Sequence, residues 1–109
     1  MSDKLATVCY KVLEIFLSQV KSPKFSIKFK TFHKVVDNFM KSRETDLRQL
    51  LVRNNEKHRV SPNNLKSVLR KIAKKHDWLS LYSRGNYTYI FVENVEYAKS
   101  EIENVLRGY

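Results

Sequence analysis

The 109-residue sequence is poor in cysteine, glycine and proline, with one, two and two residues respectively. Because Cys9 has no second cysteine to pair with, an intramolecular disulfide is excluded, and we expect a reducing intracellular compartment, the cytoplasm or the nucleoid or nucleus. Two glycines cannot form a Gly-rich phosphate-binding loop. The scarcity of glycine and proline also leaves few breaks, so most of the chain should form regular structure.

Long apolar runs are absent as well. No stretch approaches the roughly 18 consecutive apolar residues of a membrane span, and the N-terminal segment lacks the continuous apolar run and cleavage site of a signal peptide. We therefore expect no membrane partner. The composition is 42% hydrophobic and 12% aromatic, which suffices for one core and predicts a single domain over residues 1–109.

Acidic residues are few relative to basic ones. Eleven Asp and Glu stand against 21 Lys and Arg, a formal net charge of +10 with a pI near 9.8. Such a charge favours encounter with polyanions and is typical of nucleic-acid-binding domains. Charge alone leaves acidic protein partners and anionic membranes open. The abundance of Lys, Asn, Tyr and Ile indicates an A·T-rich genome, such as that of a virus or plasmid.

The first half of the chain changes between helical and strand periodicity. Apolar residues at three-and-four spacing predict a helix over 3–20, and strict alternation predicts a short edge strand over 24–30. A second helical stripe covers 31–40, with Thr31 as its N-cap, and a shorter helix follows with Thr45 as its cap.

The clearest local signal begins a helix over 61–76. Ser61 is a favoured N-cap residue, and Pro62 occupies the first helical position, where its missing N–H costs nothing. Val60 and Leu65 are spaced as a hydrophobic staple across this cap. We therefore expect a helix whose first turn is well defined.

The rest of the chain predicts a β-hairpin and a last helix. Aromatic and β-branched residues fill 78–92, where Gly85 and Asn86 supply the positive backbone angles of a tight turn. Asn94 can cap a helix over 94–108. The expected fold class is α+β, mainly helical, with a small antiparallel sheet and a C-terminal helix.

The helix over 61–76 carries five cations and no carboxylate. A phosphate backbone binds long cationic donors interleaved with amides and hydroxyls. The predicted nucleic-acid contacts all lie off the apolar stripe of this helix: Asn63, Asn64, Lys66, Ser67, Arg70, Lys71, Lys74 and Lys75. We expect base-edge contacts from its N-terminal half and phosphate contacts from its last three lysines. The competing interpretation is a solvated helix face, although such faces usually mix both charge signs.

The expected order is helix, short strand, helix, helix, basic helix, hairpin and helix. Over residues 5–92 this order resembles the winged helix-turn-helix fold. The resemblance implies that helix 61–76 is a recognition helix in the major groove of DNA and that hairpin 78–92 is the wing. Helix 31–40 is extra to the simplest three-helix plan.

The hairpin offers two kinds of contact. Arg84 and Asn86 at its tip are the expected wing contacts, and the turn itself explains these residues equally well. Trp78, Tyr87 and Tyr89 suit stacking on unpaired bases, but for Trp78 and Tyr89 the hairpin core or a cross-strand pair is favoured.

A second basic concentration surrounds the first strand. It either extends a phosphate track or protects an exposed strand edge, and edge protection is favoured. Its members are Lys21, Lys24, Lys28, Lys30 and Lys34.

The last helix carries an apolar seam in alternating three-and-four steps. Such a seam is typical of a short coiled coil, so we expect a homodimer contact, with packing onto the first helix as the alternative. The predicted contact residues are Val95, Ala98, Ile102, Val105 and Tyr109.

Catalytic patterns are weak. The histidines His33, His58 and His76 are scattered, and His33 with Asp37 is expected to be a surface pair. One cysteine does not make a zinc site. Because no pattern indicates a cluster of catalytic or ligand-binding residues, we expect no metal, cofactor, small-molecule substrate or enzyme activity. The sequence predicts a double-stranded DNA-binding protein acting as a transcriptional regulator. The alternatives are a winged-helix protein–protein assembly module and a binder of single-stranded nucleic acid or RNA.

Overall fold

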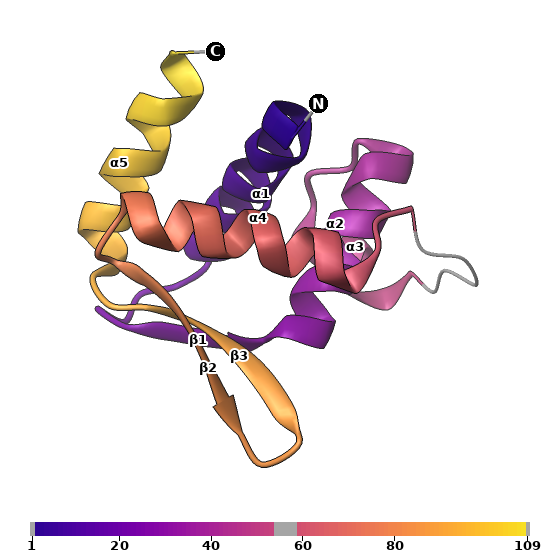
Figure 1. Ribbon diagram of the computed structural model, residues 1–109. Coiled ribbons are helices and arrows are strands. Elements are labelled where there is room, and N and C mark those ends of the chain that lie inside the picture. The colour runs from indigo at the N-terminus through magenta and orange to yellow at the C-terminus, as the bar shows by residue number, and fades with distance from the viewer. Residues whose placement is uncertain (1, 54–58, 109) are drawn as a thin grey trace.

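The computed structural model describes residues 2–53 and 59–108, which form five helices and one three-stranded antiparallel sheet (Figure 1). The chain is therefore α+β and mainly helical, as predicted. The elements in chain order are α1 (Ser2–Leu17), β1 (Phe25–Lys28), α2 (Phe29–Ser42), α3 (Leu47–Val52), α4 (Pro62–Lys75), β2 (Leu79–Arg84), β3 (Tyr87–Val92) and α5 (Val95–Arg107).

Helix α1 is the centre of the helical layer. It packs against α2, α4 and α5, and Figure 1 shows α4 crossing in front of it. The side chains of Cys9, Val12 and Leu13 are fully buried on α1, because apolar residues three and four positions apart point to the same neighbours. The helix thereby fixes the positions of the two helices, α4 and α5, that flank the hairpin in sequence.

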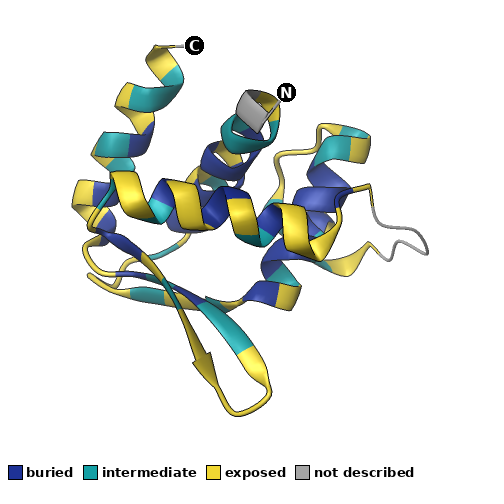
Figure 2. Ribbon diagram, in the orientation of Figure 1, coloured by how far each residue is buried: buried dark blue, intermediate teal, exposed yellow. Residues whose placement is uncertain are grey.

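The sheet has the strand order β1-β3-β2, so β1 is an edge strand as predicted. Ile27 and Leu81 both lie opposite Ile90 in the antiparallel register. Ile90 and Val92 are fully buried and face the helices, while Phe91 between them faces the other side of the sheet. The β2–β3 hairpin extends away from the helices, and its tip is exposed (Figure 2).

The predicted caps of α4 and α5 are confirmed. The Asn64 N–H donates to Ser61 Oγ at 3.1 Å, and the Tyr97 N–H donates to Asn94 Oδ1 at the same distance. Each side chain therefore satisfies one of the N–H groups that a helix start leaves without an intrahelical acceptor.

Two other helix starts differ from the prediction. Helix α2 begins at Phe29, so Thr31 lies inside it, and the cap position is Lys28, which makes no side-chain capping bond. Phe29 is buried and opens the apolar stripe of α2, so tertiary packing outweighs capping preference there. Helix α3 is capped by Asp46, whose carboxylate accepts from the Arg48 N–H at 3.0 Å, and not by Thr45.

The pair formed by His33 and Asp37 is buried, so the expectation of a surface pair was wrong. Their exposed fractions are 5% and 1%. Asp37 Oδ1 accepts from the backbone N–H groups of Arg59 and Val60 at 3.1 Å each, and His33 Nε2 donates to the Val60 carbonyl at 2.6 Å. The pair thus anchors the segment that leads directly into α4. His58 lies outside the described residues.

The apolar seam of α5 belongs to the core of the single chain. Val95, Ala98 and Ile102 are at most 1% exposed, and α5 packs against α1. They are covered within the chain, which corrects their assignment as a dimer contact and bears out the alternative of packing onto the first helix. Val105 is half-buried against the same core, and Tyr109 lies outside the described residues.

Candidate nucleic-acid interface

The outward side of α4 consists of the residues predicted from the sequence. Leu65, Val68, Leu69 and Ile72 form its buried side, so the remaining positions face solvent (Figure 2). Lys66 is half-buried. The other predicted contacts on α4 are exposed, namely Asn63, Asn64, Ser67, Arg70, Lys71, Lys74 and Lys75.

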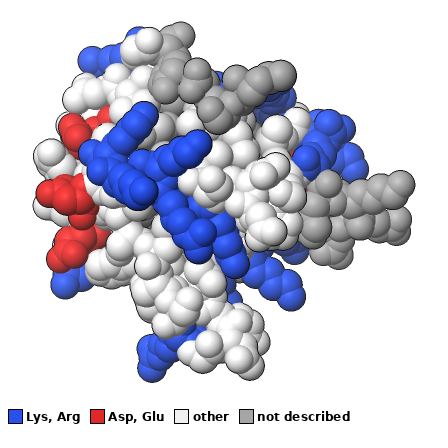
Figure 3. Space-filling model, in the orientation of Figure 1, with Lys and Arg blue, Asp and Glu red and all other residues white. Residues whose placement is uncertain are grey.

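The charge of this face has one sign. Lys and Arg form a band over α4 in Figure 3, and the Asp and Glu side chains visible there gather at the left margin, on the α5 side. None of the five α4 cations forms an ion pair with a described residue. Cations that are not paired within the described part of the chain remain available to attract an external polyanion.

Both ends of α4 are held by side chains from other elements. At its start, Asp37 and His33 hold residues 59 and 60, as described above. At its end, His76 Nε2 is hydrogen-bonded to the Tyr10 hydroxyl at 3.0 Å, and its ring stacks on Trp78 with centroids 4.9 Å apart. A helix fixed at both ends presents its outward side chains on a rigid support, which lowers the entropic cost of binding.

Trp78 belongs to the core and not to a binding surface. Its side chain is 2% exposed, which agrees with the favoured interpretation of a hairpin-core residue. Tyr89 forms a cross-strand pair with Tyr82, their rings stacked at 5.3 Å. Tyr82 and Tyr87 are 41% and 51% exposed. They alternate along their strands with Leu81 and Ile90, which pack into the core, so both tyrosines lie on the outer side of the sheet.

The hairpin tip presents the two predicted wing residues to solvent. Arg84 and Asn86 are both exposed. Gly85 between them has a φ of +62°, the left-handed region that glycine adopts without steric cost. The positive φ predicted for Gly85 is therefore confirmed, whereas the positive φ predicted for Asn86 was wrong, since among the described residues other than glycine only Arg43 has one.

Lys28 of β1 and Lys30 of α2 lie beside α4, a juxtaposition that sequence analysis missed. Lys28 and Lys30 line a pocket of about 260 Å³ together with Lys66 of α4 and Asn86 of the hairpin. Lys28 and Lys66 are 38 positions apart, and no local pattern connects them. Edge protection, the interpretation favoured for these lysines, does not explain why Lys28 and Lys30 line the same pocket as Lys66.

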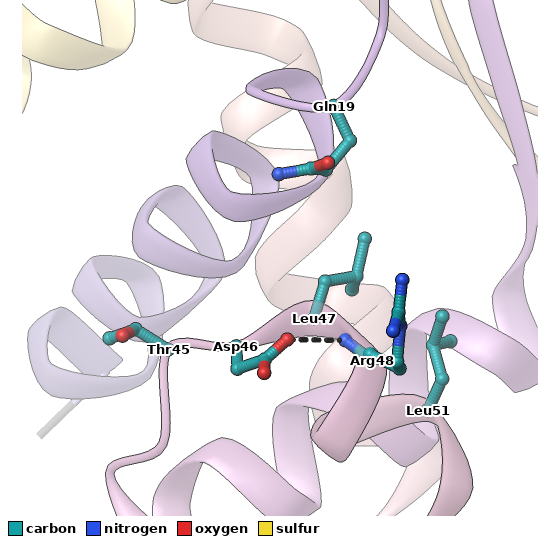
Figure 4. A pocket seen from close by; sticks show the side chains of 6 residues that line it. All are labelled: Gln19, Thr45, Asp46, Leu47, Arg48 and Leu51. Atoms are coloured by element: carbon teal, nitrogen blue, oxygen red, sulfur yellow. Dashed lines mark hydrogen bonds between the residues drawn. The ribbon is translucent and has the colours of Figure 1, made fainter.

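A larger hollow of about 520 Å³ lies between the end of α1 and the start of α3 (Figure 4). Gln19, Leu47 and Leu51 line it, and Asp46 beside them is engaged in capping α3. Among its described lining residues the one cation is Arg48, which is accompanied by the Asp46 carboxylate. The hollow lacks the one-signed charge found over α4.

Other reactive groups lie apart from these surfaces. Burial of Cys9 raises the pKa of its thiol to about 12, so the group stays protonated near neutral pH. Among the described residues, no three His, Cys, Asp or Glu side chains are grouped to hold a metal ion.

In residues 2–53 and 59–108 the helices are too short or too polar to span a bilayer.

Comparisons of the chain with protein-family models, curated proteins and solved structures found no match.

Proposed function

We propose that this chain is a non-catalytic double-stranded DNA-binding protein of winged-helix type that regulates transcription. In this proposal α4 is the recognition helix, and the β2–β3 hairpin is the wing. The observation that carries it is the outward side of α4, where four exposed cations and the half-buried Lys66, without a carboxylate on the helix, lie beside a projecting hairpin. A duplex major groove admits one α-helix, and its flanking phosphates attract cations on such a helix.

The two halves of α4 suit different parts of a duplex. Asn63, Asn64 and Ser67 in its first half are short hydrogen-bond donors and acceptors that suit base edges. Arg70 suits either a guanine edge or a phosphate. The lysines of its second half suit phosphates, which position a protein on DNA without reading its sequence.

The decisive test is the double variant Arg70→Ala/Lys74→Ala, measured by duplex titration at several salt concentrations. If both cations contact phosphates, affinity falls, and the slope of log affinity against log salt decreases in magnitude by about 1.8, from about 0.9 per contact. Lys99→Ala/Arg107→Ala is the matched control, because it also removes two cations, but from α5, where both are paired with glutamates.

The control variant should keep the salt slope of the wild type. Unchanged affinity and slope in the Arg70/Lys74 variant, with the fold verified by circular dichroism, would exclude α4 as the DNA-binding element. Equal losses in both variants would mean that net charge matters and the position of α4 does not.

The second candidate is binding of single-stranded nucleic acid, and the exposed tyrosines of the hairpin favour it. Tyr82 and Tyr87 lie on the outer side of the sheet, near the cations Lys28 and Arg84. Bases stack on such rings with little sequence preference. Competition between duplex and single strand at equal salt separates the two candidates, and Tyr82→Ala should weaken single-strand binding alone.

A further inference from the structure

The pocket between α4 and the hairpin collects cations from three elements. Lys28 ends β1, Lys30 lies in the first turn of α2, and Lys66 projects from α4. Asn86 adds the amide of the hairpin turn. The remaining lining residues are uncharged: Phe29, Tyr87 and Thr88. Three lysines and one asparagine therefore line a pocket whose described wall residues include no carboxylate.

Two of these cations are held over aromatic rings of the same pocket. Lys28 Nζ lies 4.4 Å from the ring centroid of Tyr87, and Lys66 Nζ lies 5.2 Å from that of Phe29. Both distances are within the range of cation–π attraction. The rings thus limit the freedom of two flexible side chains before a ligand arrives, which reduces the ordering cost of binding.

The size of the pocket suits a small anionic group. Its volume of about 260 Å³ is below the roughly 300–1,000 Å³ of sites for drug-sized ligands. Like charges brought together in one place repel each other, and an anion among them relieves that repulsion. A tetrahedral phosphate offers several acceptor oxygens, enough to serve three ammonium groups and an amide at once.

We propose that this pocket binds one phosphate group of a nucleic acid backbone through Lys28, Lys30, Lys66 and Asn86. The assignment to nucleic acid rests on the proposed function. A phosphate bound here contacts both α4 and the hairpin, and so sets the position of the wing relative to the recognition helix. The three lysines come from different elements, and all three contact the same phosphate group.

The first experiment asks whether the pocket binds phosphate at all. Inorganic phosphate replaces chloride at constant ionic strength, and amide shifts are followed by NMR. We expect saturable shifts confined to residues 28–30, 66 and 86–88, and their loss in Lys28→Gln/Lys30→Gln/Lys66→Gln. The proposed phosphate site is wrong if no amide shifts appear, if the shifts spread evenly over the basic surface, or if they persist in this triple variant.

The second experiment asks whether the phosphate belongs to nucleic acid. Duplex affinity and salt slope are compared between the pocket variant and Lys4→Gln/Lys11→Gln/Lys41→Gln, which removes three exposed lysines outside the pocket. One bound phosphate predicts a slope smaller in magnitude by about 0.9 in the pocket variant and a smaller change in the control.

The two proposals fail in different ways. If duplex binding persists with an unchanged slope in the pocket variant, the nucleic acid assignment of the pocket is wrong, and inorganic phosphate shifts would then mark a site for a free anion. If the wild-type chain binds no duplex while the localised phosphate shifts remain, the proposed function fails and the anion site stands.

Discussion

Helices α4 and α5 are similar in length, capping and burial, but their exposed sides differ. They have 14 and 13 residues, and each starts at a capping side chain 3.1 Å from a backbone nitrogen. Each also buries an apolar stripe. The charged residues of α4 are five cations, of which Lys66 is half-buried, whereas those of α5 are three glutamates and two cations, and both α5 cations are paired with glutamates.

The difference separates what folding requires from what it leaves open. The buried stripes and caps contribute to stability in both helices. Exposed charges contribute little to it, since surface ion pairs are worth about 0–1 kcal/mol. Folding does not demand the one-signed face of α4, so that face is the part of the molecule that indicates a partner.

The largest expected effect tests whether the buried apolar stripes of α4 and α5 contribute equally to the free energy of unfolding. Ile102→Ala in α5 and Leu69→Ala in α4 each remove a fully buried side chain, which should lower the free energy of unfolding by about 2–5 kcal/mol. Urea unfolding at two protein concentrations measures both. If the loss of unfolding free energy for Ile102→Ala depends on protein concentration, α5 takes part in a dimer contact. The buried sides of α4 and α5 would then have different roles.

The next effect concerns how the two helices begin. Residues before α4 are held by the Asp37 carboxylate, whereas α5 starts with a backbone bond from the Val95 N–H to the Pro23 carbonyl at 2.9 Å. Asp37→Ala leaves the buried Val60 N–H without its carboxylate acceptor and should cost about 1–3 kcal/mol.

Amide hydrogen exchange distinguishes the regions in that variant. The first turn of α4 should exchange faster, and the first turn of α5 should be unchanged. Asp37→Asn is the control, because it retains an oxygen acceptor at the same position. Equal acceleration in both helices would mean that Asp37 supports the whole fold and has no special part at α4.

The smallest effect compares the two caps. Ser61→Ala and Asn94→Ala each remove one side-chain acceptor and should lower the free energy of unfolding by about 1 kcal/mol. Duplex affinity should fall only for Ser61→Ala, since fraying there displaces Asn63 and Asn64. A matching loss of affinity for Asn94→Ala would contradict the assignment of binding to α4.

Prediction from the sequence succeeded where neighbours along the chain decide the outcome. The start of α4 follows from Ser61 and Pro62, and the hairpin turn follows from Gly85. It was wrong where a distant contact outweighs a local preference. Phe29 begins α2 two residues before the expected cap because its side chain is buried.

The candidate site shows the same division. The eight predicted contacts of α4 are on its outward side, because the position of an apolar stripe leaves the other positions to solvent. Lys28 and Lys30 were assigned to edge protection, since nothing near them in sequence indicates that Lys66 lies at the same pocket. Burial of His33 and Asp37 was missed for the same reason.

The sequence by itself determined the apolar stripes, the caps of α4 and α5, the turn of the hairpin and the one-signed charge of α4, because each depends on side chains within one short segment. Only the tertiary structure decided that α1 covers the stripe of α5, that Asp37 holds the approach to α4 and that three lysines share a pocket. These contacts join residues far apart in the chain, and they exist only once the helices and the sheet have packed around a common core.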